Sequence, residues 1–411
     1  MNSIQKTSFV IAILVIALSL SCSKPPLKPR AVHFHTETLI RLGHPGDNWC
    51  ITWNAEGHQL TNMCDGNWLN GEHHYHNHVY RIVGDPNTFT RENTPGYPQF
   101  VRELGGWFGY GIVSVGNNIY SMVSKTPGEN WSGPFRGIKM LKSPDSGKSW
   151  YRVNSLGGER FLDPWDDDTR EDISHNEMFF MEESGRNGHD GLAYPFSFCS
   201  FVQNGQANSA ALDDYIYIYS PEGSQTSQLL LARVKQDQIE KLDRWEYFTG
   251  WEGNKPVWTK DLEERAVIHK FPEKNDSSEY FGWYSWLPSV VWNEGLGLYI
   301  MVNGGTYAGR GLTDSRKDYY SAWMHTKTGS LGFWYAKKPY GPWNQFFYTD
   351  YWIVDDEKNR TYQPKLSPKW ISEDGRNMVL IWSDAMRNEE GKSHTVNYRW
   401  NQMEITLEME Q

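Results

Sequence analysis

The chain has 411 residues and carries 50 acidic against 40 basic side chains, for a formal net charge of −10 at neutral pH. An acidic chain without a basic stripe is not expected to bind nucleic acid. Tryptophan is unusually abundant, with 20 residues beside 23 tyrosines. Such flat apolar side chains fill the cores of sheet proteins, and they also suit the C–H faces of sugar rings.

The N-terminus predicts export. Lys6 precedes an apolar run over 9–20, which is too short to span about 30 Å of hydrocarbon as a helix. A positive start, a short apolar core and small residues after it are typical of a secretory signal peptide. The run leads into Leu-Ser-Leu-Ser-Cys at 18–22, which resembles a bacterial lipobox, although Ser19 departs from the preferred leucine. We expect lipidation at Cys22; the alternative is an ordinary signal peptide with a chance cysteine.

Three segments follow from this reading. Residues 1–21 are the expected lipoprotein signal peptide, and 22–31 form a Pro-rich, extended tether. Residues 32–411 contain no second linker and are expected to form one domain. The predicted location is the bacterial cell envelope, at the outer membrane or the cell surface, with membrane contact through the lipid anchor only.

The rest of the chain repeats a strand, a tight polar turn and a second strand. Gly, Asn and Asp at the turns permit the positive φ that hairpins need. Few segments predict helix, Gln236 to Arg244 being one possible turn. The sequence therefore predicts an all-β fold, and the spacing of the hairpins favours a β-propeller of about five blades over a large β-sandwich. The hairpins lie at 49–64, 109–124, 138–143, 211–219, 290–303 and 369–382.

One hairpin carries the pattern Ser-x-Asp-x-Gly-x-x-Trp, from Ser143 to Trp150. It resembles the Asp-box hairpin of sialidase-like propellers. Its expected role is structural: Asp145 accepts hydrogen bonds from turn amides, Gly147 takes the tight bend, and Trp150 packs between sheets.

The first hairpin holds the best candidates for chemistry. If its turn is centred on Glu56, Asp47 faces Asp65, and opposed Cβ atoms lie about 4.5–5.5 Å apart. Carboxylates roughly 5–5.5 Å apart suit a retaining glycosidase, and two close carboxylates push their pKa values apart. The alternative is that both aspartates only cap turns.

A shifted register would instead bring two cysteines of this hairpin together. Cys50 and Cys64 would then be opposed, favouring a disulfide in an oxidising compartment and leaving Cys199 as a free, buried thiol. Direct opposition of both pairs is impossible without a bulge or a diagonal bond.

Short motifs in order along the chain resemble the domain-of-unknown-function family 4185. They are Asp-x-Trp, x-Thr-Trp and Cys-Asp-Gly in the first hairpin, followed by the segments 80–84, 230–234, 247–250, 258–259, 341–343, 368–370 and 374–375. The resemblance implies a five-bladed propeller, and some members are endo-D-arabinanases of glycoside hydrolase family 183. It also implies that two aspartates of the first hairpin act as nucleophile and acid/base. These map onto Asp65 and Asp47, in that order or exchanged.

Other residues are candidates for binding substrate. Trp49 and Trp68 are possible sugar platforms, although core packing is the usual fate of a tryptophan. Four histidines crowd the loop 72–78, where His74 and His76 are expected to contact sugar hydroxyls at the rim of the site. His189 and Asp190 are candidates for further polar contacts, the alternative being a turn.

Metal and cofactor requirements are not expected. The histidine loop is a weak Zn²⁺ or Cu²⁺ candidate, and the acidic run from 163 to 172 is a weak Ca²⁺ candidate without EF-hand spacing. The sequence as a whole predicts an exported glycoside hydrolase acting on a polysaccharide, with a D-arabinan-like furanoside polymer as the candidate substrate. The alternative is a non-catalytic glycan-binding surface lipoprotein.

Overall fold

A computed structural model describes most of the chain from residue 28 onward. The described residues are 28–104, 106–125, 137–165, 179–181, 195–197, 199–222, 225–271, 281–282, 287–304, 306–307, 329–355, 361–384 and 397–410. The expected signal peptide and Cys22 lie outside them. Within these ranges no helix has the length and apolar character needed to cross a bilayer.

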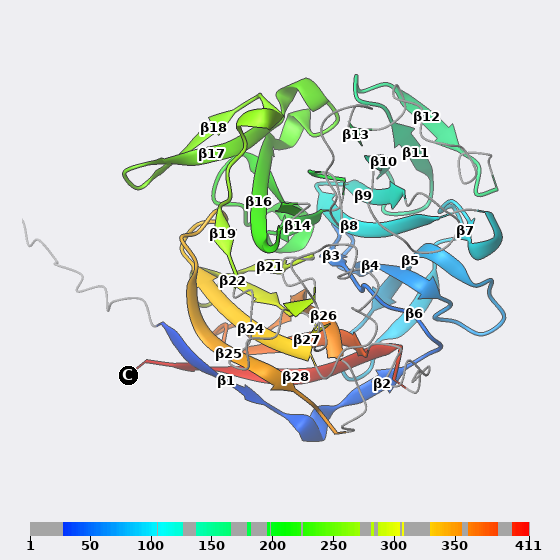
Figure 1. The fold of residues 1–411 in the computed structure, drawn as a ribbon. Coiled ribbons are helices and arrows are strands. Elements are labelled where there is room, and N and C mark those ends of the chain that lie inside the picture. Colours follow the sequence, from blue (N-terminus) through cyan, green and yellow to red (C-terminus); the bar gives the residue numbers. More distant parts are fainter. Residues whose placement is uncertain are drawn as a thin grey trace, which may run out of the picture.

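The secondary structure of this part is almost entirely antiparallel strand (Figure 1). One group contains β3 (Ile51–Trp53), β4 (Gln59–Gly66), β5 (Tyr75–Val83) and β6 (Thr90–Asn93), with β7 (Phe100–Val101) also on β5. The next contains β8 (Trp107–Val115), β9 (Asn118–Lys125), β10 (Gly137–Ser143), β11 (Trp150–Val153) and β12 (Glu159–Leu162), with β13 (Phe180–Met181) on β10.

Two further groups share one hydrogen-bonded sheet. The first has β14 (Ser200–Gln203), β15 (Tyr215–Glu222), β16 (Gln225–Lys235), β17 (Glu246–Glu252), β18 (Lys255–Thr259) and β19 (His269–Lys270). The second has β20 (Phe281–Gly282), β21 (Ser289–Asn293), β22 (Leu298–Asn303), β23 (Thr306–Tyr307), β24 (Gly329–Ala336) and β25 (Asn344–Trp352). A parallel pairing of β14 with β21 joins them.

The last group brings the two ends of the described chain together. It contains β26 (Thr361–Ile371), β27 (Asn377–Asp384) and β28 (Trp400–Met409), and β28 also pairs with β1 (Pro29–Phe34) and β2 (Ile40–Leu42). Strand β1 starts inside the segment expected to be tether, because Pro29 and Ala31 pair with Met409 and Glu408. An N-terminal strand on the C-terminal sheet closes the chain on itself.

The groups stand around a common centre, as Figure 1 shows. Each group contributes one strand to a closed ring at this centre. In the ring β3 contacts β8, β8 contacts β14, β14 contacts β21, β21 contacts β26, and β26 contacts β3. A β-sandwich has no such ring, so the predicted β-propeller is confirmed over the large β-sandwich. The ring also supports five blades, but the continuous sheet through β14 and β21 leaves the blade count a prediction.

Helical structure in the described residues is limited to short 3-10 turns. They are η1 (Thr36–Thr38), η2 (Arg102–Leu104), η4 (Gln206–Asn208), η5 (Gln236–Gln238), η6 (Leu242–Arg244) and η7 (Leu262–Glu264). The possible helix at 236–244 is thus two such turns, η5 and η6. Asp237 and Asp243 fall in them, and aspartate favours caps and turns over longer helix.

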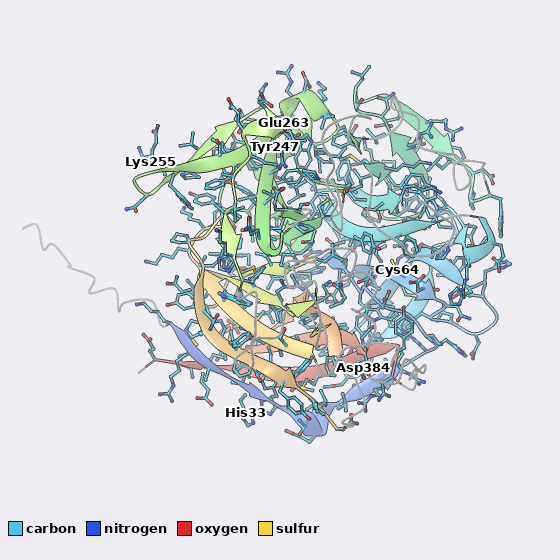
Figure 2. The ribbon with its side chains drawn as sticks, in the orientation of Figure 1. His33, Cys64, Tyr247, Lys255, Glu263 and Asp384 are labelled. Atoms are coloured by element: carbon cyan, nitrogen blue, oxygen red, sulfur yellow. The ribbon has the colours of Figure 1, made fainter. Side chains whose placement is uncertain are left out.

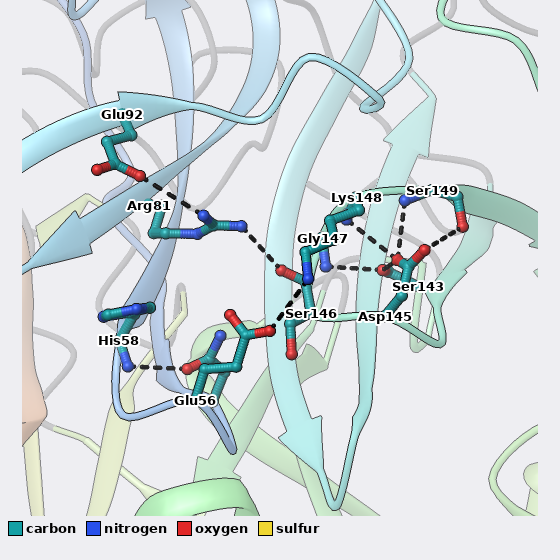
Figure 3. Close-up of polar contacts among 11 residues, drawn as sticks. Glu56, His58, Arg81, Glu92, Ser143, Asp145, Ser146, Gly147, Lys148 and Ser149 are labelled. Atoms are coloured by element: carbon teal, nitrogen blue, oxygen red, sulfur yellow. Dashed lines mark hydrogen bonds and ion pairs between the residues drawn. The ribbon is translucent and has the colours of Figure 1, made fainter.

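The Asp-box hairpin forms as the sequence indicates (Figure 3). Asp145 Oδ1 accepts hydrogen bonds from the amides of Ser149 and Lys148, at 2.8 and 3.1 Å, while Trp150 is fully buried. The turn also reaches the first group, because Arg81 donates to the Ser146 carbonyl at 3.3 Å and Lys148 pairs with Glu56 at 3.4 Å. The motif therefore fastens β10 and β11 to the hairpin that carries Asp47 and Asp65.

Candidate functional site

The first hairpin has the register expected for a turn at Glu56, but only along β3. Strands β3 and β4 pair as predicted from Ile51 to Trp53. Before Ile51 the chain shifts by one residue, because Asn48 takes a left-handed conformation with φ of 57°. Asp47 therefore forms its bridge with Cys64, through two backbone hydrogen bonds of 2.9 Å each, and not with Asp65. The predicted direct opposition of the two aspartates is wrong by one position.

Two glycines let the segments that carry these aspartates pack closely, Gly66 against backbone and Gly46 against a side chain. A Cβ atom on Gly66 would stand 1.7 Å from the carbonyl oxygen of Pro45. A Cβ atom on Gly46 would stand 2.6 Å from the sulfur of Met63. Since no larger residue fits without displacing backbone at Gly66, the contact fixes Asp47 and Asp65 on neighbouring, tightly packed segments.

Asp65 lies opposite His76 on β5. Its backbone is left-handed, with φ of 51°, and its side chain is 25% exposed. Nδ1 of His76 lies 3.1 Å from Oδ1 of Asp65, and the imidazole packs on Phe108 with ring centroids 4.6 Å apart. His74 is also near: burial lowers its pKa, and the charge of Asp65 opposes that shift. Of the predicted contact residues, His76 therefore contacts Asp65, and His74 lies within range of its charge.

Asp47 is held where the first and last groups meet. Its side chain accepts a hydrogen bond from Asn48 at 3.1 Å and is nearly buried. Next to it, Ser383 donates from its hydroxyl to the Gly46 carbonyl at 3.0 Å. Asp384 follows Ser383 at the end of β27 and is buried (Figure 2). A third carboxylate thus stands on a segment in contact with the one that carries Asp47.

A buried lysine on β26 adds positive charge to this region. Nζ of Lys365 donates to the Leu287 carbonyl at 3.0 Å. Burial lowers the pKa of Lys365, while the nearby Cys50 and Asp47 act to raise it. The negative charge of Asp47 thus reaches Lys365 and favours its protonated form, against the effect of burial.

The cysteines correct a prediction. Cys50, Cys64 and Cys199 are all free and buried, so the expected Cys50–Cys64 disulfide is absent. The cause is the register centred on Glu56, which sets Cys50 against Asn62, while Cys64 pairs with Asp47. Burial raises the pKa of Cys50 to about 11, and burial together with the charges of Asp47 and Asp65 raises that of Cys64 well above its ordinary value. Neither thiol is ionised at neutral pH, which makes both poor nucleophiles.

The two tryptophans proposed as sugar platforms belong to the core. Trp49 and Trp68 are fully buried, and their rings lie 5.0 Å apart and within 5.3 and 4.9 Å of Trp400. Because they bury their faces against one another where the first and last groups meet, they cannot receive a substrate. Their role as binding residues is therefore corrected to packing.

The histidine run divides between site and core. Burial lowers the pKa of His78 to about 4, and its ring stacks on Tyr75 with centroids 4.4 Å apart, so it is a packing residue. Within the described ranges no three His, Cys, Asp or Glu side chains are arranged to hold a metal ion. His189, Asp190 and residues 166–172 of the acidic run lie outside the described residues.

Strained backbone was the feature that sequence reasoning missed. Four non-glycine residues with positive φ stand at or near the start of inner strands of the ring: Asn48, Phe196, Leu287 and Gln363. Such conformations persist only where the surrounding structure imposes them, and they are enriched at active sites. No sequence signal marks Phe196, Leu287 or Gln363, since only glycine, asparagine and aspartate commonly adopt this geometry. The left-handed backbones of Asn48 and Asp65 could have been predicted, because asparagine and aspartate commonly adopt this geometry.

Comparison with known proteins gives structural likeness only. No family model matches the chain, and no curated protein matches its sequence. A protein of Bacteroides ovatus ATCC 8483 is 15% identical, with 92% of this chain and 93% of that chain covered and a TM-score of 0.48. The catalytic domain of the Coprinopsis cinerea α-L-arabinofuranosidase is 9% identical, with 92% and 95% covered and a TM-score of 0.43. The endo-arabinase of Bacteroides thetaiotaomicron VPI-5482 is 11% identical, with 90% and 95% covered and a TM-score of 0.41.

Proposed function

We propose that this protein is an exported glycoside hydrolase that uses Asp65 and Asp47 as its catalytic pair. The observation that carries the proposal is the placement of the two carboxylates on segments packed backbone to backbone. Asp65 itself has a left-handed backbone, and Asp47 directly precedes the left-handed Asn48. Asp65 contacts a buried histidine, and Asp47 lies near a buried lysine. A pair of carboxylates in unlike surroundings is the arrangement that acid/base chemistry on a glycosidic bond needs.

The roles follow from exposure. Asp65 is the more accessible carboxylate, so it is placed to attack the anomeric carbon and form a glycosyl ester while the bond to the leaving oxygen breaks. Asp47 gives its proton to that oxygen. In the second step Asp47 takes a proton from water, the water oxygen bonds to the anomeric carbon, and Asp65 leaves. The anomeric configuration is retained.

The substrate we propose is a polysaccharide, with a D-arabinan-like furanoside polymer as the first choice. The support for this choice is the resemblance of the ordered motifs to the domain-of-unknown-function family 4185. The proposed location is the cell envelope, with lipid at Cys22 as the anchor, and the support is the short apolar run that ends in a lipobox-like segment.

One observation favours the second candidate function, a glycan-binding lipoprotein without catalysis. Asp47 is only 5% exposed, which restricts the access of a leaving group to its carboxyl. The two candidates predict different outcomes when the mature chain is incubated with polysaccharides, because a binder forms complexes but releases no reducing ends.

The test is a reducing-end assay of the purified protein on a panel that includes arabinan, arabinogalactan and arabinoxylan. We expect new reducing ends on at least one furanoside-containing polymer. NMR of the early product should show the same anomeric configuration as the glycosidic bond of the substrate. Product of the opposite anomer would remove the nucleophile role of Asp65, and binding without product would favour the second candidate.

A further inference from the structure

A group of partly exposed aromatic side chains lies on the outer strands of the propeller. Trp251 on β17 is 38% exposed, and its ring centroid is 6.2 Å from that of Tyr340. Trp258 on β18 lies 6.5 Å from the same tyrosine ring. Tyr340 comes from the turn between β24 and β25, so the group spans two neighbouring strand groups. The β17–β18 hairpin projects from the rim, with Lys255 at its tip (Figures 1 and 2).

A bulge brings Trp251 to this face. Pairing of β17 with β18 shifts register between Phe248 and Gly250, and Gly250 has φ of 149°. Because a bulge re-aims the side chains that follow it, Trp251 turns to the same face as the buried Phe248, with ring centroids 5.4 Å apart. The exposed ring is therefore supported from below by the core.

Polar groups able to bind hydroxyls surround these rings. The guanidinium of Arg233 lies 4.0 Å from the centroid of Trp258 and bonds to Glu246 at 2.8 Å. Asp213 is exposed and accepts a hydrogen bond from the Tyr217 hydroxyl at 2.7 Å. Burial and the charge of Asp213 raise the pKa of Tyr340, so its phenol remains a hydrogen-bond donor at neutral pH.

We infer that this surface, formed by Trp251, Trp258, Tyr340, Asp213 and Arg233, binds a neutral glycan chain apart from the Asp47–Asp65 site. Sugar rings present apolar C–H faces to aromatic rings and hydroxyls to carboxylates, phenols and guanidinium groups. Its two tryptophans lie on β17 and β18, which are separated from the inner strand β14 by β15 and β16. It would keep a polymer on the protein while another part of the same polymer occupies the Asp47–Asp65 site.

The same features argue against a protein partner. A stable protein interface buries about 1,200–2,000 Å². Among these five residues Trp251 is the one exposed large apolar side chain; Asp213 is exposed but charged, and Trp258, Tyr340 and Arg233 are half-buried. Arg233 is paired with Glu246 and Asp213 is acidic, so the surface disfavours an anionic ligand and suits a neutral one. A glycan can use the exposed ring of Trp251 as a platform, with the neighbouring polar groups as hydroxyl partners.

The test is affinity electrophoresis of the full mature protein in gels that contain arabinan, arabinoxylan or dextran. The variants are Trp251→Ala at the surface, Asp65→Asn at the proposed catalytic site, and Phe161→Ala as a matched control, because Phe161 is 55% exposed on β12 of another group. We expect at least one polysaccharide to retard the wild type. We expect Trp251→Ala to weaken retardation roughly tenfold or more, with Phe161→Ala unchanged.

The result does not depend on the proposed hydrolysis, because retardation is read without product. Retardation of Trp251→Ala equal to the wild type, or no retardation of the wild type in any gel, would overturn the inference. So would light scattering that shows a wild-type dimer and a Trp251→Ala monomer, since the surface would then be a self-association interface. Loss of hydrolysis in Asp65→Asn with retained retardation supports both proposals separately.

Discussion

Nδ1 of His76 lies 3.1 Å from Oδ1 of Asp65, across two paired strands, at a point where the Asp65 backbone is left-handed. The histidine side chain is only 3% exposed, and within the described residues its Nε2 has no hydrogen-bond partner. A buried imidazole whose hydrogen-bond partner among the described residues is an accessible carboxylate can orient that carboxylate. His76 is thus a positioning residue for Asp65.

The first prediction concerns His76→Phe, which keeps an aromatic ring against Phe108. We expect turnover on the identified glycan to fall roughly tenfold or more, because Asp65 loses the group that orients it. The melting temperature should change little, since the variant also removes a buried nitrogen that lacks a partner. The pH profile of kcat/KM should shift in His76→Phe. A sharply lower melting temperature with an unshifted profile would assign His76 to packing alone.

The second prediction concerns the close approach of Gly66 and Pro45. Gly66→Ala places a Cβ atom 1.7 Å from the Pro45 carbonyl oxygen, so the two segments must separate. We expect the free energy of unfolding to fall by roughly 1–3 kcal/mol, as for other overpacked sites, and activity to be lost with it. Gly71→Asn is the control, because nothing lies within 4 Å of a Cβ there and asparagine tolerates its φ of 79°. Equal stability of both variants would contradict the close contact.

The third prediction concerns the Asp box. Burial alone would raise the pKa of Asp145, but hydrogen bonds from Ser149, Ser143 and Lys148 hold it below its ordinary value. A carboxyl whose pKa is lower in the folded state stabilises the fold above its unfolded pKa, and that contribution is lost as the pH falls below about 4. Asp145→Ala should cost about 1 kcal/mol at pH 7 and less at pH 3, as the loss of a turn cap does. Urea unfolding at the two pH values measures the difference, and a cost that grows on acidification would contradict it.

The fourth prediction concerns the thiols. Since Cys50, Cys64 and Cys199 are free and buried, the native mature protein should react slowly with a thiol reagent. After denaturation without a reductant, three thiols should titrate. The contrary result is a single titrated thiol together with a peptide that links residues 50 and 64 in non-reducing mapping. That result would support the disulfide that the sequence suggested.

The parts of the fold that sequence predicted are those set by local rules. The turn at Glu56 and the Asp-box hairpin depend on residues adjacent in the chain, and both formed as expected. The placement of Asp47 failed by one position, because it depends on a single left-handed residue, Asn48. Periodicity cannot detect a shift of that kind.

Burial of the aromatic residues was beyond local reasoning. Trp49 and Trp68 pack on Trp400, which lies at the other end of the sequence, and only closure of the propeller brings these rings together. Trp251 looks no different in sequence, yet the bulge at Gly250 leaves it exposed. Tertiary contacts decide which tryptophans are core and which are surface.

The central claim is tested most directly by turnover and melting temperature measured together on Asp47→Asn and Asp65→Asn, with a glycan that the wild type hydrolyses. Each substitution keeps the size of the side chain and removes its ionisable group, so a nucleophile or proton donor should lose turnover by about 10² or more while the fold persists. We predict that loss in both variants, at melting temperatures near that of the wild type. Near-normal turnover in either variant would contradict the assignment of that residue.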